Sequence, residues 1–328
     1  MNKKVGFGIL ISALLVYLSV RGISLQDVLN DLNKIELTYV ILFLFLIILM
    51  QYLRSYRWGV ILQPLEKIDQ VSLFSVTSVG FLAIAAIPAR MGELARPYLI
   101  SQKSSVKMSS ALGTIIIERV LDSFTVLGIA ILLLFFIDLP SWMIHSSIIF
   151  FLLALAIFCF ILFMILRRKE TLQLVNKVLA MLPGRLADKI DELLYNFTNG
   201  LQIVTNINLL LYLIFLSVTV WLLDVLAIYV LFLAFGFHLP VIASFVLMII
   251  LIVGIAIPTA PGFIGNWHFA CVLGLSLFSV AKVEALSFAV VYHFLSMIVV
   301  VVLGVIFIPF NKFSISEMKN QINNEKQV

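Results

Sequence analysis

The chain has 328 residues, of which 62% are apolar and only 12% are charged, and its mean hydropathy is +1.15. This composition leaves too little polar surface to cover a water-soluble globule, so it excludes that class and predicts an integral membrane protein. The net charge of +5 is modest and gives no sign of nucleic-acid binding. Two cysteines, Cys159 and Cys271, lie in apolar runs without the spacing of a metal or redox site.

Runs of about 20 apolar residues can cross a hydrocarbon layer ~30 Å thick. We expect six full transmembrane helices: Val5 to Val20, Leu37 to Leu53, Ser109 to Ile137, Trp142 to Leu166, Asn208 to Phe235 and Ala285 to Phe310. No small-residue cleavage site follows the first run, which favours an uncleaved span over a signal peptide. After Ser24, a candidate N-cap, helical spacing predicts a short interfacial helix over 25–35.

Two shorter apolar runs end at matching breaks. The segments Ala86 to Gly92 and Ala256 to Gly262 share the spacing Ala-Ile-Pro-x-x-x-Gly. We expect hinges at Pro88, Gly92, Pro258, Pro261, Gly262 and Gly265. In a weaker second register, Glu118-Arg119 aligns with Tyr292-His293, and Asp122 aligns with Ser296. These repeats predict two related halves.

Basic residues in the short connections set the orientation of a membrane protein. They lie near both termini and after the second and fourth spans, at Lys3, Lys4, Arg54, Arg57, Lys67, Arg167, Arg168, Lys169 and Lys312. The connections 137–141 and 236–240 contain none. We therefore expect a multi-pass protein of the cell membrane with both termini in the cytoplasm.

The same rule decides how the broken runs enter the membrane. The charge pattern is kept only if about 71–107 and about 241–281 are re-entrant hairpins. Three full crossings then separate them, which makes the halves inverted repeats, a recurring transporter plan. The predicted fold class is an all-α polytopic membrane protein with six full transmembrane helices and two re-entrant broken-helix hairpins. We expect one membrane domain over 1–310, with a cytoplasmic amphipathic insert at 167–207 and a polar tail at 311–328.

The first break carries three charges at helical spacing, on Arg90, Glu93 and Arg96. If the segment after Pro88 is helical, Glu93 can pair with either arginine and one positive charge remains. That surplus, with backbone N–H groups freed at the break, would suit a phosphate. The alternative is a salt-bridge cluster that only holds the hairpin in place.

Further ionisable groups lie inside the predicted spans, where each needs a partner or a polar cavity. Glu118 and Asp122 share one helix face, and Arg119, or Arg90 and Arg96, can serve them. They form either a polar pathway that takes up protons or a buried network that holds the hairpin to its neighbour. Other candidate binding residues are a lone acid and a cluster around the second break: Asp224, Trp267, His268 and His293.

Motifs for nucleotide, metal and hydrolase chemistry are absent from the sequence. It has no Walker loop, dinucleotide fingerprint, HExxH helix or nucleophile elbow. We expect no catalytic residues, metal or cofactor, and no ATP hydrolysis.

The charged motifs also resemble a known family. Ile87-Pro88-Ala89-Arg90-Met91-Gly92-Glu93-Leu94-Ala95-Arg96 is followed by Glu118-Arg119-Val120-Leu121-Asp122, with Arg57-Trp58 upstream and Pro258 to Gly265 downstream. This pattern resembles the flippase-like transmembrane region of lysylphosphatidylglycerol synthases and its stand-alone members, over about residues 5 to 310. Many members continue Pro-Gly-Gly-x-Gly and then Glu in the second hairpin, where this chain has Pro261 to His268. Only 18 residues follow the last span, so the resemblance implies lipid translocation without synthesis.

The sequence therefore predicts a protein that moves an anionic phospholipid or a lipid-linked, polyprenyl-type precursor between leaflets. The headgroup would rest on Arg90 and Arg96 beside Glu93 in a midplane cavity. Two alternatives remain open: an ion-coupled transporter of a small anionic solute, and a subunit or enzyme of lipid-linked sugar metabolism with Glu118 and Asp122 as acid and base. A homo-oligomer and a separate lipid-synthesising enzyme are further partners that the sequence allows.

Overall fold

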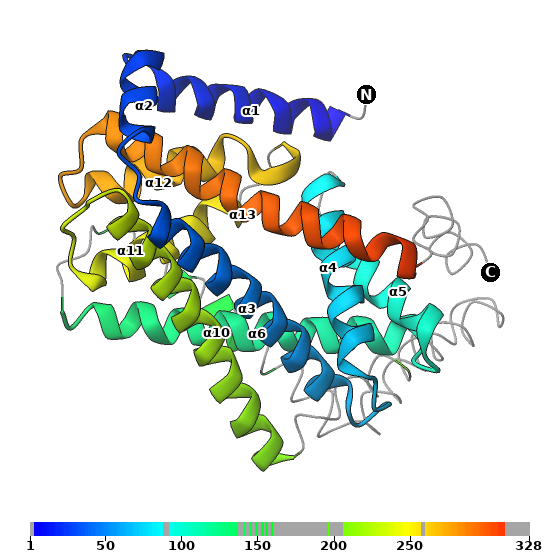
Figure 1. The fold of residues 1–328 in the computed structure, drawn as a ribbon. Coiled ribbons are helices and arrows are strands. Elements are labelled where there is room, and N and C mark those ends of the chain that lie inside the picture. Colours follow the sequence, from blue (N-terminus) through cyan, green and yellow to red (C-terminus); the bar gives the residue numbers. More distant parts are fainter. Residues whose placement is uncertain are drawn as a thin grey trace. The chain divides into compact units, whose positions relative to one another are not determined.

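The computed structural model describes residues 3–87, 92–136, 206–256 and 260–311, together with single positions between 141 and 159 and Asn196. Within these residues the chain is helical and contains no strand. Figure 1 shows the helices in chain order. They are α1 (Lys3–Val20), α2 (Leu25–Leu32), α3 (Leu37–Leu62), α4 (Gln70–Ala86), α5 (Ala95–Lys103), α6 (Met108–Leu133), α10 (Ile207–Ala234), α11 (Val241–Ala256), α12 (Asn266–Ser276) and α13 (Lys282–Asn311).

Three of the described helices, α3, α10 and α13, are long and apolar enough to cross a membrane. They confirm three of the six predicted spans. The helix α6 is 26 residues long and covers most of the predicted span Ser109 to Ile137. It carries three charged side chains. The predicted span Trp142 to Leu166 and the insert 167–207 fall almost entirely outside the described residues, as do Pro88, Arg90 and Pro258.

The end predicted for the second span was wrong. The helix α3 continues past Leu53 to Leu62, so Arg54 and Arg57 lie within it and not in a connecting loop. Arg57 is buried, with 1% of its side chain exposed. The apolar run stops at Arg54, but the helix does not, because carboxylates on another helix neutralise the Arg57 guanidinium.

The helix boundaries repeat along the chain. The helix α10 begins 170 residues after α3 (207 minus 37), and α11 begins 171 after α4 (241 minus 70). The helix α12 begins 171 residues after α5 (266 minus 95), and α13 begins 174 after α6 (282 minus 108). A succession of long helix, broken pair and long helix therefore occurs twice, which extends the repeat predicted from the two breaks.

The second broken pair folds back on itself. A Cβ atom at Gly254 of α11 would lie 2.7 Å from Ala270 Cβ of α12, and one at Gly274 would lie 2.8 Å from Leu247. These contacts pair the end of one helix with the beginning of the other, so the two helices are antiparallel. Asn266 Nδ2 donates a hydrogen bond to the Gly254 carbonyl oxygen at 3.1 Å. The turn between them uses the positive φ of Gly262 (70°) and Gly265 (97°), two of the predicted hinges.

The first break also brings the chain close to the helix before it. A Cβ atom at Gly92 would overlap the carbonyl group of Ala83, so only glycine fits there. The helix α5 that follows packs against α6. Residues 95–100 of α5 are buried, and they include Arg96 and Tyr98.

Two compact units divide the residues between them. Unit 1 contains Met1–Tyr52, Gly80–Glu93 and Thr219–Ile306, and unit 2 contains Leu53–Val79, Leu94–Val218 and Phe307–Val328. Neither unit equals one half of the sequence. Unit 1 has an aromatic core around Phe232 and Phe288, whose ring centroids are 5.2 Å apart. Unit 2 has an aliphatic core that includes Ile61, Ile117 and Leu213.

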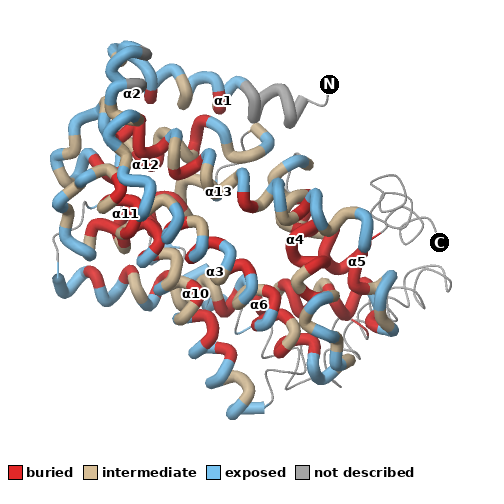
Figure 2. The backbone as a smooth tube through the Cα atoms, viewed as in Figure 1, coloured by how far each residue is buried: buried red, intermediate tan, exposed pale blue. Residues whose placement is uncertain are grey.

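Large apolar side chains are exposed along the helices, as expected for lipid-facing surfaces. Figure 2 shows exposed residues along α3, α10 and α13. They include Phe45, Phe215, Phe294 and Phe310, each more than half exposed. The chain is thus a helical membrane protein with buried polar side chains in its interior.

Candidate functional site

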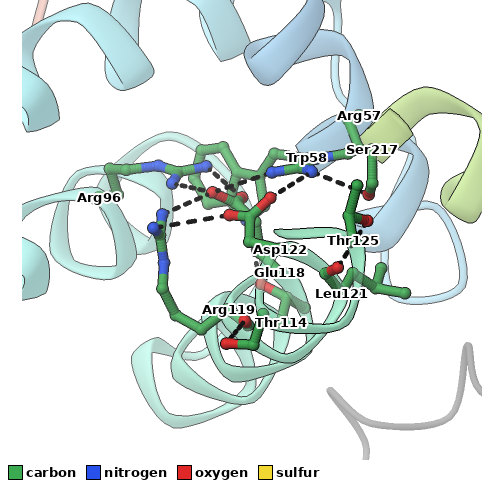
Figure 3. Close-up of polar contacts among 11 residues, drawn as sticks. Arg57, Trp58, Arg96, Thr114, Glu118, Arg119, Leu121, Asp122, Thr125 and Ser217 are labelled. Carbon is green, nitrogen blue, oxygen red and sulfur yellow. Dashed lines mark hydrogen bonds and ion pairs between the residues drawn. The ribbon is translucent and has the colours of Figure 1, made fainter. Parts of the chain in front are cut away.

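Unit 2 contains a network of five charged side chains from three helices (Figure 3). The helix α3 contributes Arg57, α5 contributes Arg96, and α6 contributes Glu118, Arg119 and Asp122. We call these five residues the charged network. On α6, the two carboxylates are four residues apart and therefore share one face.

Glu118 lies at the centre of the charged network and is 1% exposed. Arg96 donates to both carboxylate oxygens, from Nη1 to Oε1 and from Nη2 to Oε2, each at 2.9 Å. Arg119 Nη2 donates to Oε1 at 2.9 Å, and Arg57 Nη2 lies 3.7 Å from the same oxygen. Such a two-pronged arginine–carboxylate pair fixes both distance and plane, so it joins α5 rigidly to α6.

Asp122 occupies the second position on the same face of α6. Arg57 Nη1 donates to its Oδ1 at 2.6 Å and to Ser217 Oγ of α10 at 2.8 Å. Arg119 Nη1 lies 3.6 Å from Asp122 Oδ2, which makes this a longer ion pair. The Arg57 side chain thereby connects α3 to both α6 and α10.

An aromatic side chain fixes the orientation of Arg96. The Arg96 guanidinium carbon lies 4.3 Å from the centroid of the Trp58 ring, within the range of a cation–π contact. Trp58 Nε1 donates to Thr114 Oγ1 at 3.0 Å, and that hydroxyl donates to the Ala111 carbonyl at 2.7 Å. The guanidinium is therefore held between an indole face and a carboxylate.

The charged network carries a net charge of +1, from three guanidinium groups and two carboxylates. Its five side chains differ strongly in their exposure to solvent. Arg57, Arg96 and Glu118 are at most 2% exposed and Asp122 is 13% exposed, whereas Arg119 is 49% exposed. The surplus positive charge can therefore be reached from outside at Arg119. Among the described residues, no group of three or more His, Cys, Asp or Glu could hold a metal ion.

The charged network lies at different positions along α3 and α6. At 1.5 Å per residue, Arg57 lies about 8 Å from the end of α3, and Glu118 and Asp122 lie about 15 and 21 Å from the start of α6. Ser105, just before α6, donates to Glu66 Oε2, just after α3, from its backbone N at 2.8 Å. The end of α3 and the start of α6 are therefore adjacent, so these distances are measured from the same side of the two helices. Glu118 and Asp122 therefore lie on either side of the midpoint of the 26-residue helix α6, whereas Arg57 lies near the end of α3.

A second polar cluster lies in unit 1, where α12 packs beside α13. The ring centroids of Trp267 and Tyr292 are 5.0 Å apart, and those of His268 and His293 are 4.9 Å apart. Trp267 also contacts His293, at 5.5 Å between centroids. His293 Nε2 lies 2.7 Å from the Gly262 carbonyl oxygen, so the ring donates a hydrogen bond to the turn between the broken helices.

Comparison with known proteins places this architecture in a family. The family described as the lysylphosphatidylglycerol synthase TM region matches residues 5–304. The chain belongs to this family. The resemblance drawn from the charged motifs is thereby confirmed over nearly the whole chain.

Similar proteins include two UPF0104 membrane proteins. A UPF0104 membrane protein of Methanothermobacter thermautotrophicus is 25% identical over 88% of this chain and 90% of its own length. The UPF0104 membrane protein MJ1078 of Methanocaldococcus jannaschii is 28% identical over 72% of this chain and 97% of its own length. No solved structure gives a significant match.

The sequence predicted four of the five residues of the charged network as site residues. Arg96, Glu118, Arg119 and Asp122 were all candidates, and the structure brings them together in unit 2. Arg57 was missed as a site residue, although an arginine beside a tryptophan near an apolar run was a usable signal. Ser217 was also missed, because a single serine in a membrane helix carries no pattern.

The remaining candidates lie elsewhere. Arg90 is outside the described residues, and Glu93 is half-buried in a short turn that precedes α5. Asp224 is half-buried on α10, in unit 1. The candidates Trp267, His268 and His293 belong to the polar cluster of unit 1 and not to the charged network.

Proposed function

We propose that this chain moves an anionic phospholipid or lipid-linked precursor between membrane leaflets, and that the lipid phosphate binds at the Arg119 edge of the charged network. The observation that carries the proposal is a network of three guanidinium groups and two carboxylates, in which four side chains are largely buried and Arg119 is half exposed. Ionised groups inside a membrane protein are costly and usually mark a substrate or ion path. A network with a purely structural role would be more stable with balanced charges.

The donors of the charged network favour a phosphate as the ligand. Arginine presents a planar set of N–H groups that matches phosphate oxygens. Arg57 Nε is buried and has no hydrogen-bond partner among the described residues, so the network retains an unused donor. The 3.6 Å contact of Arg119 with Asp122 is longer than its 2.9 Å contact with Glu118. A phosphate oxygen would replace the longer contact first.

In this mechanism each side chain has a distinct task. Arg119 binds the phosphate, while Glu118 and Asp122 hold the guanidinium groups in position and keep the empty site from carrying three uncompensated charges. Arg96 acts as a positioning residue, since Glu118 engages both of its terminal nitrogens. The acyl chains stay in the bilayer against the exposed apolar helix faces. The two broken pairs act as re-entrant hairpins of inverted repeats, which supplies the alternating geometry that translocation needs.

No catalytic step is part of this proposal. Both Glu118 oxygens accept hydrogen bonds from guanidinium groups, an arrangement that suits a fixed counter-ion better than a proton donor. We therefore expect translocation without chemical change of the lipid.

The test is Arg119→Gln in liposomes that contain a fluorescent anionic phospholipid. Loss of one charged hydrogen bond, about 1.5–3 kcal/mol, should weaken lipid binding roughly 10-fold or more and slow transbilayer movement. Arg119→Lys keeps the charge but loses the planar donor set, so we expect an intermediate rate. Arg21→Gln, at an exposed arginine outside the network, is the matched control and should behave as the unaltered protein.

Two results would overturn the proposal. The first is unchanged lipid movement in Arg119→Gln protein of unchanged thermal stability. The second is uptake of a small anionic solute into protein-containing liposomes without any lipid movement, which would favour a solute transporter.

A further inference from the structure

The polar cluster of unit 1 contains two buried polar atoms that no described residue satisfies. Trp267 Nε1 and Ser296 Oγ are shielded from solvent and have no hydrogen-bond partner within the described part of the chain. Buried polar groups in proteins are nearly always paired, and each exception calls for an explanation such as a bound ligand. An indole N–H and a hydroxyl left unpaired in one small region therefore point to an absent partner molecule.

Trp267 packs on α13 next to the turn of the helix that carries Ser296. Trp267 contacts the rings of Tyr292 and His293 on α13, at 5.0 and 5.5 Å between centroids. Ser296 follows these two residues by four and three positions, so it lies on the same face of α13, one turn further along. The unpaired hydroxyl is thus next to the surface on which the indole packs.

The geometry around the cluster is fixed from several sides. His293 Nε2 donates to the Gly262 carbonyl at 2.7 Å, and Ala260 N donates to Ser12 Oγ of α1 at 2.8 Å. A Cβ atom at Gly265 would lie 2.6 Å from the Ser12 carbonyl oxygen, so α1 packs directly on the turn before α12. The turn that leads into Trp267 is therefore held in place by α1 and by His293.

We propose that Trp267 Nε1 and Ser296 Oγ form a second binding site, which takes an oxygen acceptor of a membrane lipid headgroup. An indole N–H can only donate, which excludes a metal ion or an ammonium group as its partner. Phosphodiester, ester and hydroxyl oxygens all accept from such a donor. The choice of a lipid as the source rests on the proposed function; the acceptor chemistry does not.

A third donor of the same cluster follows from its hydrogen bonds. Gly265 N lies 3.5 Å from His268 Nδ1, so this ring nitrogen accepts and the neutral ring carries its proton on Nε2. The His268 ring packs against His293 with 4.9 Å between centroids. The cluster therefore offers an indole, a hydroxyl and an imidazole donor without any cationic side chain of its own.

The internal repeat gives this site a counterpart. In the register that aligns α6 with α13, Glu118 and Arg119 correspond to Tyr292 and His293, and Asp122 corresponds to Ser296. The positions that carry charge in unit 2 thus carry neutral hydrogen-bonding groups in unit 1. A headgroup held by neutral donors is bound less tightly than one held by a guanidinium, which suits a site where the lipid arrives or leaves.

The test compares Trp267→Phe and Ser296→Ala with the unaltered full chain, with and without lipid. Ser276→Ala is the matched control, since its exposed hydroxyl on α12 bonds only the Leu273 carbonyl of its own turn at 2.7 Å. In lipid-free detergent both test variants should be as stable as the unaltered protein or more so, because each removes an unpaired buried group. With phosphatidylglycerol in mixed micelles, each should bind roughly 5–10-fold more weakly, the effect of one lost hydrogen bond.

Soluble probes separate the sources of the acceptor. Glycerol 3-phosphate and inorganic phosphate are added in place of the lipid. Stabilisation by phosphatidylglycerol, and by neither soluble probe, supports a headgroup whose lipid stays in the bilayer. Equal stabilisation by inorganic phosphate overturns the lipid assignment.

Equal lipid binding by Trp267→Phe, Ser296→Ala and the unaltered protein overturns the site itself and leaves ordered water as the partner. The two proposals fail separately. If the unaltered protein moves no lipid while Trp267→Phe still loses binding, the proposed function fails and this site remains. If Arg119→Gln slows lipid movement while Trp267→Phe binds and moves lipid normally, this site fails and the proposed function remains.

Discussion

Replacing Arg57 by methionine tests whether the charged network is held together as the structure shows. Arg57 is 1% exposed, and its Nη1 lies 2.6 Å from Asp122 and 2.8 Å from Ser217. Methionine keeps the length and apolar stem of the side chain but removes the 2.6 Å contact with Asp122. Removing one partner of a buried ion pair costs about 3–5 kcal/mol, because the other charge stays buried without compensation.

A double-mutant cycle separates the pair from its surroundings. Asp122→Asn alone removes the other partner, and Arg57→Met/Asp122→Asn removes both. Because the double variant buries no unmatched carboxylate, we expect it to recover at least 2 kcal/mol relative to the sum of the single variants, as coupled residues do. Its network still carries a charge of +1, from two arginines and one glutamate, so lipid binding should survive in the double variant.

The assay is unfolding by denaturant in detergent micelles, with lipid binding measured on the same preparations. The single Arg57→Met variant has a neutral network, so it should lose both stability and lipid binding. The reasoning is refuted if Arg57→Met stays within about 1 kcal/mol of the unaltered protein, the range of an exposed ion pair. It is equally refuted if the double variant is as unstable as the single variants combined.

Two further predictions concern the turns and caps. Gly265→Ala should destabilise the protein by about 2 kcal/mol or more in thermal unfolding, since its φ of 97° and the Ser12 carbonyl 2.6 Å away both oppose a Cβ; Gly128→Ala, with open space around its Cβ, is the control and should have little effect. Asp69 caps α4 by accepting a hydrogen bond from Ser72 N at 2.8 Å, and this bond lowers the pKa of the exposed Asp69 carboxyl. Asp69→Ala should cost about 1 kcal/mol at neutral pH and Asp69→Asn less. The capping stability is present above the ordinary Asp pKa of about 3.9 and is lost as the pH falls through the lower folded value, so the Asp69→Ala deficit should shrink in acid. A deficit that stays constant down to pH 2 would contradict the capping assignment.

The sequence by itself determined the class of the protein and most of its helices. Apolar runs separated by Pro, Gly and charged residues predicted α4, α6, α10, α11 and α13 to within a few residues. This worked because membrane helices must satisfy their own backbone hydrogen bonds, so apolar length alone indicates a span. The repeated Ala-Ile-Pro-x-x-x-Gly spacing also indicated the two broken pairs, and the charged motifs indicated the family.

The pairing of the charges was decided by the tertiary structure. The sequence offered Arg96 two kinds of partner, Glu93 on its own segment and the carboxylates of the following span, and it could not choose between them. The packing of α5 against α6 brings the Arg96 guanidinium to Glu118, 22 residues away, and α3 adds Arg57 to Asp122 from 65 residues away. Which arginine keeps an exposed face, Arg119, depends on this three-dimensional arrangement of helices, and no local pattern records it.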